Sequence, residues 1–293
     1  MDLLKYCEDK MGAAVLFKPS KLKLQKKAAK VRVSAGSSTN IVKTARSPLR
    51  YPGGKTRAAA YIIENYIGNP ETICSPFAGG ASIELELASK GTRVFCYDNF
   101  EPLVIFWQEL LNDPATLATK VKNYYKLSST MFYNLQKSFF SINDRIEIAA
   151  RFYAINRSSF SGTTLSGGMS PGHPRFTISS IQRIEDFKID NFTVKLADFT
   201  QSIPRHRNDF LYCDPPYLSE QKLYGIRGDK HIDFNHDALC ELLKARSGWV
   251  LSYNDSPEIR KMYQGHRIIK PEWTYGMGNN KKSNELIILS KDL

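Results

Sequence analysis

The sequence predicts an α/β protein with a mostly parallel β-sheet and a second, largely helical domain inserted into it. From Ser47 onward, short runs rich in β-branched and aromatic residues alternate with amphipathic stretches, which is typical of a parallel sheet covered by helices. About 95 residues separate the second expected strand from the third, whereas a crossover between parallel strands needs far fewer. This interval carries helical patterns of its own, so we expect it to be an inserted domain.

The expected elements alternate along the chain. Strands are expected at residues 71–75, 93–97, 192–197, 209–213, 249–253, 267–270 and 285–290. Helices are expected at residues 56–67, 81–89, 100–111, 114–126, 143–155, 235–246 and 256–263. The chain therefore divides into a basic flexible arm (1–46), a main α/β domain (47–111 and 191–293) and the inserted domain (112–190), which contains a Gly/Ser/Pro-rich loop.

Composition places the chain among globular proteins. Hydrophobic residues make up 42% and aromatic residues 12% of its 293 residues, which excludes a mainly disordered chain. No apolar run approaches the ~20 residues that span a bilayer. The N-terminal segment contains Asp2, Glu8 and Asp9 and has no long apolar core, unlike a secretory signal. We therefore expect a cytoplasmic protein with no membrane partner.

The net charge of +12 is concentrated at the N-terminus. Residues 1–46 contain 11 Lys and Arg against 3 Asp and Glu. Such a segment suits binding to the phosphate backbone of a nucleic acid, and a solvated basic extension explains the charge equally well.

The cysteines and histidines predict neither a metal site nor a disulfide framework. Five cysteines are scattered without a CxxC pair, which argues against a zinc ribbon and a thioredoxin-like site. Cys74, Cys96 and Cys213 lie in strand-like apolar runs, so we expect buried thiols in a reducing compartment. His231 and His236 are five residues apart and do not align on one helix face.

A rigid turn follows the expected strand 209–213. Asp214, Pro215, Pro216 and Tyr217 come directly after it, where proline can continue neither a ladder nor a helix. The turn therefore lies beyond the carboxyl end of a sheet strand, where open α/β sheets bind ligands. Asp214 and the Pro215 carbonyl suit the two hydrogens of an exocyclic amine, and Tyr217 suits stacking on a planar base. The structural alternative is a rigid turn capped by an aspartate.

Two further motifs follow the first two strands. Phe77, Ala78 and Gly79 belong to a glycine turn between a strand and a helix, where the backbone can approach a ligand closely. Asp98 and Asn99 end the second strand, and Asp98 comes 19 residues after Gly79. An acid at that place suits the two hydroxyls of a ribose, although Asp98 would also cap the following helix well.

The remaining motifs lie before the first strand and after the third. Asp198 suits the amine of a cofactor's adenine with Phe199 beside the ring, and a helix cap explains Asp198 equally well. The segment RYPGGKT has Leu49 where a phosphate-binding P-loop requires glycine. We therefore expect a glycine turn that carries Tyr51 and Lys55 to a site.

The order of these motifs resembles the DNA adenine methyltransferase (Dam) family over about residues 47–291. The segments that carry the resemblance are RYPGGK, SPFAGG, YDN, a long insert, ADF, DPPY and the late LSYND at residues 251–255. The resemblance implies a Rossmann-like methyltransferase sheet whose last strand is antiparallel. It also implies transfer of a methyl group from S-adenosylmethionine to the N6 amine of adenine in DNA, with S-adenosylhomocysteine as product and no metal.

The same resemblance assigns roles to individual residues. The residues that it places around the cofactor are Tyr51, Lys55, Phe77, Ala78, Gly79, Asp98, Asn99, Asp198 and Phe199. It implies that the turn Asp214, Pro215, Pro216 and Tyr217 holds a target adenine flipped out of the duplex. The insert 112–190 would be the target-recognition domain, and its expected DNA contacts are Arg157, Ser158, Ser159 and Arg175.

Two other functions stay open at this point. Methylation of cytosine at N4 needs the same amine chemistry, but relatives with that activity more often have serine at the position of Asp214. A catalytically silent DNA-binding protein of the same fold is the alternative of another class. The expected partner is double-stranded DNA, with or without a cognate restriction endonuclease, and a monomer from a prokaryote or a phage is favoured.

Overall fold

The structure is a computed structural model that describes residues 46–170, 175–218, 234–271 and 284–293. The chain separates into two units, Met1–Ile41 and Val42–Leu293, and the described residues belong to the second. The expected basic arm 1–46 therefore lies outside the described residues except for Arg46.

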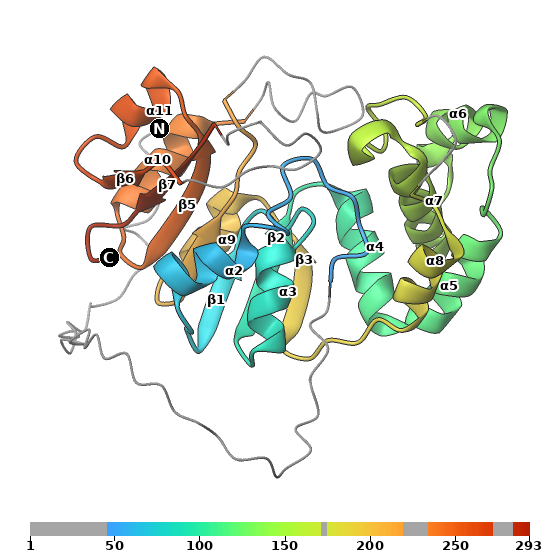
Figure 1. Ribbon diagram of the computed structural model, residues 1–293, viewed down its shortest axis with the longest axis horizontal. Helices are drawn as coiled ribbons and strands as arrows, with labels where there is room; N and C mark the ends of the chain where they lie inside the picture. Colours follow the sequence, from blue (N-terminus) through green and yellow to red (C-terminus); the bar gives the residue numbers. More distant parts are fainter. Residues whose placement is uncertain (1–45, 171–174, 219–233, 272–283) are drawn as a thin grey trace, which may run out of the picture. The chain divides into compact units, whose positions relative to one another are not determined.

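Seven strands form one sheet in the order β3-β2-β1-β4-β5-β7-β6 (Figure 1). The strands are β1 (Thr72–Ser75), β2 (Arg93–Asp98), β3 (Phe192–Leu196), β4 (Phe210–Cys213), β5 (Trp249–Asn254), β6 (Arg267–Ile269) and β7 (Glu285–Leu289). Strands β3, β2, β1, β4 and β5 are parallel, whereas β7 runs antiparallel to both β5 and β6. The expected α/β class, with a mostly parallel sheet and an antiparallel last strand, is confirmed.

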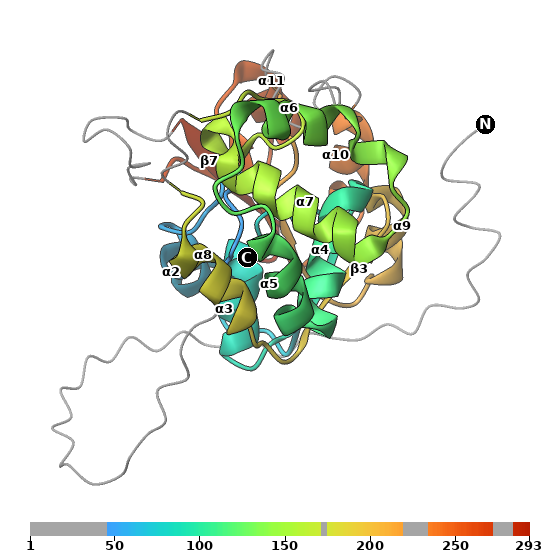
Figure 2. The same ribbon diagram turned by 90° about the vertical axis from the view of Figure 1, so that its right-hand side faces the viewer.

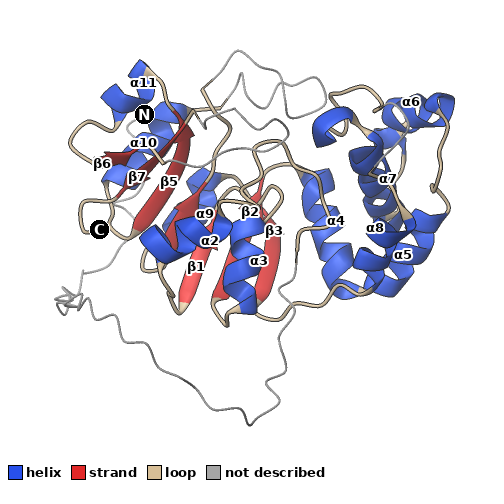
Figure 3. Cartoon of the chain, in the orientation of Figure 1, coloured by secondary structure: helices blue, strands red, loops and turns tan. Residues whose placement is uncertain are grey.

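Alternate residues of the central strands face two different hydrophobic clusters, because successive side chains of a strand point to opposite faces. Val250 belongs to one cluster and Leu251 to the other, and Ile287 and Ile288 divide in the same way. The first face is covered by α2 (Ala59–Ile62), α3 (Ser82–Ser89) and α4 (Glu101–Asn112). The second is covered by α9 (Phe199–Arg205), α10 (His236–Lys244) and α11 (Pro257–Met262). Figure 3 shows the helices (blue) that lie beside the strands of the sheet (red).

The expected burial of three cysteine thiols is also found among the described residues. Cys74, Cys96 and Cys213 are free thiols, fully buried in the core. Burial raises the pKa of the Cys213 thiol well above its usual range. Cys213 therefore stays protonated and is unsuited to act as a nucleophile, although it directly precedes the turn at Asp214.

A group of helices between β2 and β3 packs against helix α4. The group consists of α5 (Pro114–Lys122), α6 (Ser129–Lys137), α7 (Arg145–Ser158) and α8 (Ile178–Glu185). Helix α4 contacts both the sheet strand β3 and helix α7, so it joins the group to the sheet. Figure 2 shows α7 beside α4, α5 and α6, in agreement with their packing contacts.

The structure differs from the sequence prediction mainly in short helices. The expected helix 56–67 is a short α2 followed by a π-helical turn (Ile63–Ile67) that ends at Gly68, where φ is 73°. Helices α6, α8 and α9 were not expected. Each is short and begins at a capping side chain, from Ser128, Thr177 and Asp198 respectively, which accepts a backbone amide of the first turn.

Candidate active site

A cavity of about 570 Å³ is lined by segments that follow β1, β2, β3 and β4. The strand order reverses between β1 and β4, and open α/β sheets bind ligands at such a point. The volume is within the range of small-molecule sites. The cavity is lined by all the residues expected to bind the cofactor or the target base: Tyr51, Lys55, Phe77, Ala78, Gly79, Asp98, Asn99, Asp198, Phe199, Asp214, Pro215, Pro216 and Tyr217.

Hydrogen bonds from two neighbouring elements hold the glycine turn after β1. The Gly79 amide donates to Asp98 Oδ2 at 3.1 Å, and the Gly79 carbonyl accepts from Trp107 Nε1 at 3.1 Å. The Ala78 amide donates to the Tyr97 carbonyl at 2.7 Å. Strand β2 and helix α4 therefore fix the backbone that lines the cavity.

Glycine at positions 79 and 80 leaves room for the side chain of Tyr51. A Cβ atom at Gly79 would lie 3.0 Å from Tyr51 Cε1, and one at Gly80 would lie 2.9 Å from Tyr51 Cβ. Gly79 also has a φ of +44°, in the region that favours glycine. The segments RYPGGK and SPFAGG thus meet in space, with Tyr51 lying against the glycine turn.

The acids at the end of β2 and after β3 hold the local backbone and also line the cavity. Asp98 Oδ1 accepts the Phe100 amide at 2.9 Å. Asp198 caps α9 by accepting the Thr200 amide at 2.9 Å, so its capping role is present. Asn99 Nδ2 lies 3.5 Å from Asp198 Oδ2. An ionised carboxylate has about four acceptor sites, so these bonds are compatible with additional ligand contacts.

Three phenylalanine rings form an aromatic wall beside Asp198. The ring centroids of Phe77 and Phe199 lie 5.8 Å apart, and Phe234 lies 5.6 Å from Phe77 and 5.1 Å from Phe199. All three residues line the cavity. Such a wall suits a planar ring, because aromatic pairs favour offset or edge-to-face contact at these separations.

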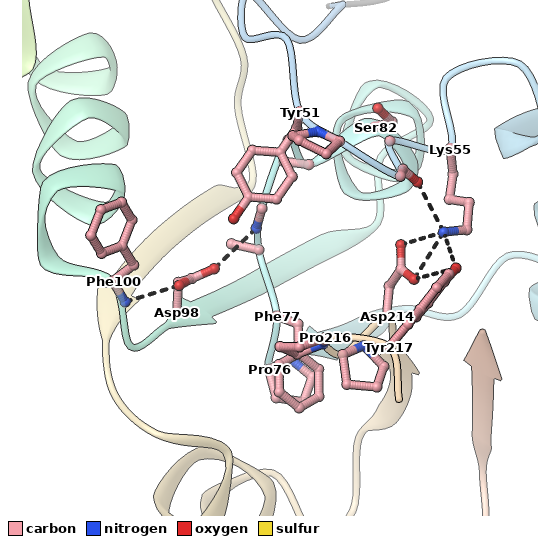
Figure 4. Close-up of a pocket in the computed structure, with 18 of the residues that line it drawn as sticks. Tyr51, Lys55, Pro76, Phe77, Ser82, Asp98, Phe100, Asp214, Pro216 and Tyr217 are labelled. Atoms are coloured by element: carbon pink, nitrogen blue, oxygen red, sulfur yellow. Dashed lines mark hydrogen bonds and ion pairs between the residues drawn. The ribbon is translucent and has the colours of Figure 1, made fainter. Parts of the chain in front are cut away.

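The turn after β4 carries a cluster of charged and phenolic groups. The Lys55 ammonium lies 2.7 and 2.9 Å from the two Asp214 oxygens, and it donates to the Gly53 carbonyl at 3.0 Å and the Tyr217 hydroxyl at 2.8 Å. Tyr217 in turn donates to Glu285 Oε1 at 2.6 Å, an oxygen 3.5 Å from Lys55 Nζ. Figure 4 shows the Lys55, Asp214 and Tyr217 side chains pointing toward one another. The Lys55 ammonium therefore interacts with two carboxylates, those of Asp214 and Glu285.

Burial and charge shift the pKa values of this cluster in defined directions. Burial alone lowers the pKa of Lys55, but Asp214 and Glu285 outweigh it and the net pKa lies above the usual lysine value. Burial raises the pKa of Asp214, Glu285 adds to the rise, and Lys55 offsets part of it. Glu84 also lines the cavity, and burial raises its pKa to about 7 although the Ser75 hydroxyl donates to it at 2.7 Å. Lys55 thus stays charged at neutral pH.

Asn254 holds the chain directly after Tyr217. Its Oδ1 accepts the Leu218 amide at 3.1 Å, and its Nδ2 donates to the Leu218 carbonyl at 2.9 Å. The Tyr217 ring also stacks beside Tyr253, with centroids 6.0 Å apart. The late LSYND segment therefore supports the turn from the neighbouring strand β5.

A second asparagine, Asn156 at the end of α7, holds the segment before Tyr51. Its Oδ1 accepts the Arg50 amide at 2.9 Å, and its Nδ2 donates to the Arg50 carbonyl at 2.7 Å. Asn156 Nδ2 also lies within hydrogen-bond distance of the Gly162 carbonyl and Thr164 Oγ1. The loop after α7 is therefore tied to the cavity, and its residues 162–165 line it.

The four residues expected to contact DNA differ in their exposure to solvent. Arg175 is exposed, whereas Arg157 is half-buried and donates to the Arg175 and Pro48 carbonyls. Ser158 and Ser159 are fully buried, and the Ser159 hydroxyl bonds within its own loop. Their burial is at odds with direct contact between these two serine side chains and DNA. The Ser159 hydroxyl holds the loop instead, by donating to the Asn156 carbonyl and accepting the Thr164 amide.

Several residues of the site were not expected from the sequence. Glu285, Asn156, Phe234 and Glu84 are the main ones. A signal existed for Glu285, an acid at the start of the apolar run ELIIL, and for Asn156, a polar residue directly after the apolar stretch FYAI. Phe234 carried no such signal, because its role depends on the approach of segments distant in sequence.

The described ranges contain neither a cluster of metal-ligating side chains nor a membrane-spanning helix. No group of three or more His, Cys, Asp or Glu side chains is arranged to hold a metal ion in residues 46–170, 175–218, 234–271 and 284–293. Within the same ranges, none of the helices has both the length and the apolar character needed to cross a membrane.

The chain is similar to known DNA methyltransferases. Retron Ec67 DNA adenine methylase of Escherichia coli is 23% identical over 266 residues, which cover 83% of this chain and 90% of the relative. DNA adenine methylase of Vibrio cholerae is 22% identical over 276 residues, 86% of this chain and 99% of the relative. The type II methyltransferase M.MjaIII of Methanocaldococcus jannaschii is 24% identical over 258 residues, 76% of this chain and 89% of the relative.

The family model of D12 class N6 adenine-specific DNA methyltransferases matches residues 51–277. Apart from Arg50, this range contains the motifs that carry the resemblance, from Tyr51 to the LSYND segment, and the resemblance is confirmed. With a match over most of its length, a confirmed sheet topology and a cavity lined by these motifs, this chain belongs to the D12 class of N6 adenine-specific DNA methyltransferases, enzymes that methylate adenine at specific sites in DNA.

Proposed function

We propose that this chain binds S-adenosylmethionine against the glycine turn and holds a flipped adenine of double-stranded DNA at the turn Asp214–Tyr217. The observation that carries the proposal is that one cavity is lined by both turns. Two reactants bound in one cavity can be held in line for transfer, and such positioning supplies much of the rate enhancement.

The described residues fit the proposed cofactor. Among those that line the cavity, five are carboxylates, and Lys55 is the one cation. This balance suits a ligand that carries a sulfonium and an ammonium. Asp98 would accept the ribose hydroxyls, and the wall of Phe77, Phe199 and Phe234 beside Asp198 would hold the adenine ring. When bound, S-adenosylmethionine supplies an electrophilic methyl group and leaves as S-adenosylhomocysteine.

The turn after β4 would bind and activate the target base. The lone pair of an adenine amine is conjugated with the ring, which makes the amine a poor nucleophile. Hydrogen bonds from this amine to Asp214 and the Pro215 carbonyl would favour tetrahedral nitrogen and stabilise its developing positive charge. Tyr217 would stack on the base and offset part of the few kcal/mol that base flipping costs.

The helical insert, residues 112–190 in our proposal, would bind the duplex. Near the end of α7, Arg157 is close enough to Arg50, Arg175 and Arg183 for their charges to act on it: burial lowers its pKa, and these arginines lower it further. In the described part of the chain, Arg157 makes no ion pair with a carboxylate. A DNA phosphate would relieve this repulsion, which favours the insert as the DNA-binding element.

The relatives support a proposal for the setting of the enzyme. We propose that it is a cytoplasmic enzyme encoded by a prokaryote or a phage, with or without a cognate restriction endonuclease. Relatives named as type II methyltransferases support the link to restriction-modification. A monomer is sufficient for the proposal, because the motifs that line the cavity come from one chain.

The test is direct methyl transfer. Purified protein would be incubated with methyl-labelled S-adenosylmethionine and unmethylated DNA, and the DNA digested to nucleosides. Label in N6-methyladenosine is the expected result, and sequencing for modified adenines would then identify the site. Label in N4-methylcytosine would reassign the substrate, and no label despite cofactor binding would overturn the proposal.

A further inference from the structure

We propose that Glu285 is a positioning residue for methyl transfer, because its carboxylate balances the charge of Lys55 and leaves the negative charge of Asp214 available to the target amine. This inference rests on the proposed function. Glu285 lies at the start of β7, and its backbone is held in register with Asn254 of β5. It is 6% exposed, so solvent does little to screen its charge.

The contacts of Lys55 show why a single carboxylate beside it would leave the cluster without net negative charge. Its ammonium has three N–H donors, and its partners are the Gly53 carbonyl, the Tyr217 hydroxyl and the Asp214 carboxylate. Without a second acid, Lys55 and Asp214 would form a neutral pair. Glu285, with Oε1 3.5 Å from Lys55 Nζ, brings the net charge of the cluster to about one negative unit.

The reaction requires that negative charge at the transition state. The N6 lone pair forms a bond to the methyl carbon, the carbon–sulfur electron pair stays on sulfur, and N6 becomes positively charged. N6 then loses one proton, for which Asp214 is the nearby acceptor in the proposed complex. A neutral Lys55–Asp214 pair would stabilise this cation poorly, whereas a cluster with an excess carboxylate stabilises it well.

The arrangement also affects the protonation of Asp214. The titratable groups around this carboxylate are Lys55, Tyr217, Glu285 and Glu84. Lys55 lowers the pKa of Asp214, whereas burial and Glu285 raise it. Removing the charge of Glu285 should therefore lower that pKa. The acid limb of the transfer rate, which reports protonation of Asp214, should move to lower pH.

The decisive variant is Glu285→Gln, because glutamine can still accept the Tyr217 hydrogen bond but carries no charge. We expect the single-turnover rate on a preformed complex to fall about tenfold to a hundredfold. Binding of S-adenosylmethionine should weaken by a smaller factor than the transfer rate falls, because four other carboxylates line the cavity. The matched control is Glu147→Gln on α7, where the glutamate also accepts from a tyrosine, Tyr124, and a cation, Arg151, away from the cavity.

A double-mutant cycle with Lys55→Gln separates charge balance from structure. If Glu285 acts by balancing Lys55, Glu285→Gln should have little further effect once Lys55 is neutral. Equal losses in both backgrounds, or an acid limb that does not move, would assign Glu285 a structural role. A wild-type rate in the Glu285→Gln variant would overturn the inference alone, whereas no adenine methylation by wild type would overturn the proposed function itself. Should Glu285→Gln fail to fold, Glu285→Asp, which keeps the charge, should retain the wild-type acid limb.

Discussion

Asp214 is the residue on which the proposed chemistry depends most. Its carboxylate is bound by Lys55 and lies in the cavity that also contains the glycine turn. We expect Asp214→Ala to reduce methyl transfer to below about one per cent of wild type, because the developing charge on N6 loses its main acceptor. Cofactor affinity, measured by calorimetry, should remain. Asp237→Ala, an exposed acid on α10, is the control. If Asp214→Ala transfers methyl groups at more than about one per cent of the wild-type rate, Asp214 does not have the proposed role in the mechanism.

Arg175 is one of two exposed arginines, with Arg183 of α8, whose charges act on Arg157 at the end of α7. We expect Arg175→Gln to weaken binding to DNA of any sequence. The slope of log affinity against log salt should become shallower by about one, the effect of one lost phosphate contact. Fluorescence anisotropy over a salt series measures both quantities. Lys291→Gln removes the same charge from an exposed position near the C-terminus and should leave the slope unchanged. Equal slopes for both variants would place Arg175 outside the DNA interface.

At the scale of elements, two asparagines hold two motifs of the cavity by the same pair of hydrogen bonds to the backbone. Asn254 binds both backbone groups of Leu218 after the Asp214 turn, and Asn156 binds both backbone groups of Arg50 before Tyr51. The hydrogen bonds of Asn156 couple the end of α7 to the cavity. The position of Tyr51 against the glycine turn therefore depends on a residue of the helical insert.

Asn156→Ala tests this coupling. The variant leaves the amide and carbonyl of Arg50 without their partner, and a buried unsatisfied group costs about 1–3 kcal/mol. We expect a lower free energy of unfolding in urea and weaker binding of S-adenosylmethionine, because Tyr51 follows Arg50 directly. Asn134→Ala, at an exposed position of α6, serves as the control. If cofactor affinity stays at the wild-type value while stability falls, Asn156 supports the fold alone.

The elements that could be predicted from the sequence are those with a strong local signal. The seven strands were predicted within about two residues, because runs such as WVLSY and ELIIL are buried on both faces and almost continuously apolar. Helices α6, α8 and α9 were missed, because they are short and owe their starts to capping side chains. The motifs of the cavity were found because each directly follows a strand or turn. Glu285 could be detected as an acid at the start of an apolar run, but its pairing with Lys55 and the role of Phe234 arise only when distant segments meet.

At the scale of the whole molecule, a basic chain contains an acidic cavity. The net charge is +12, yet the described lining of the cavity has Asp98, Asp198, Asp214 and two glutamates against Lys55. The two signs serve different ligands in the proposed function. Positive charge outside attracts the DNA phosphates, and negative charge inside favours a cationic methyl donor and the charge that develops on N6.

Deletion of residues 1–46 tests whether positive charge outside the cavity contributes to DNA binding. The deleted arm carries 11 Lys and Arg against 3 Asp and Glu, most of the excess charge of the chain. We expect weaker binding to non-specific duplex DNA and a shallower salt slope, since fewer counterions are released on binding. The single-turnover rate at saturating DNA should stay at the wild-type value, because the family match begins at residue 51 and the cavity is lined by residues from Tyr51 onward. An unchanged salt slope would make the arm a solvated extension with no part in DNA binding. A lost transfer rate at saturating DNA would instead make the arm part of the catalytic unit.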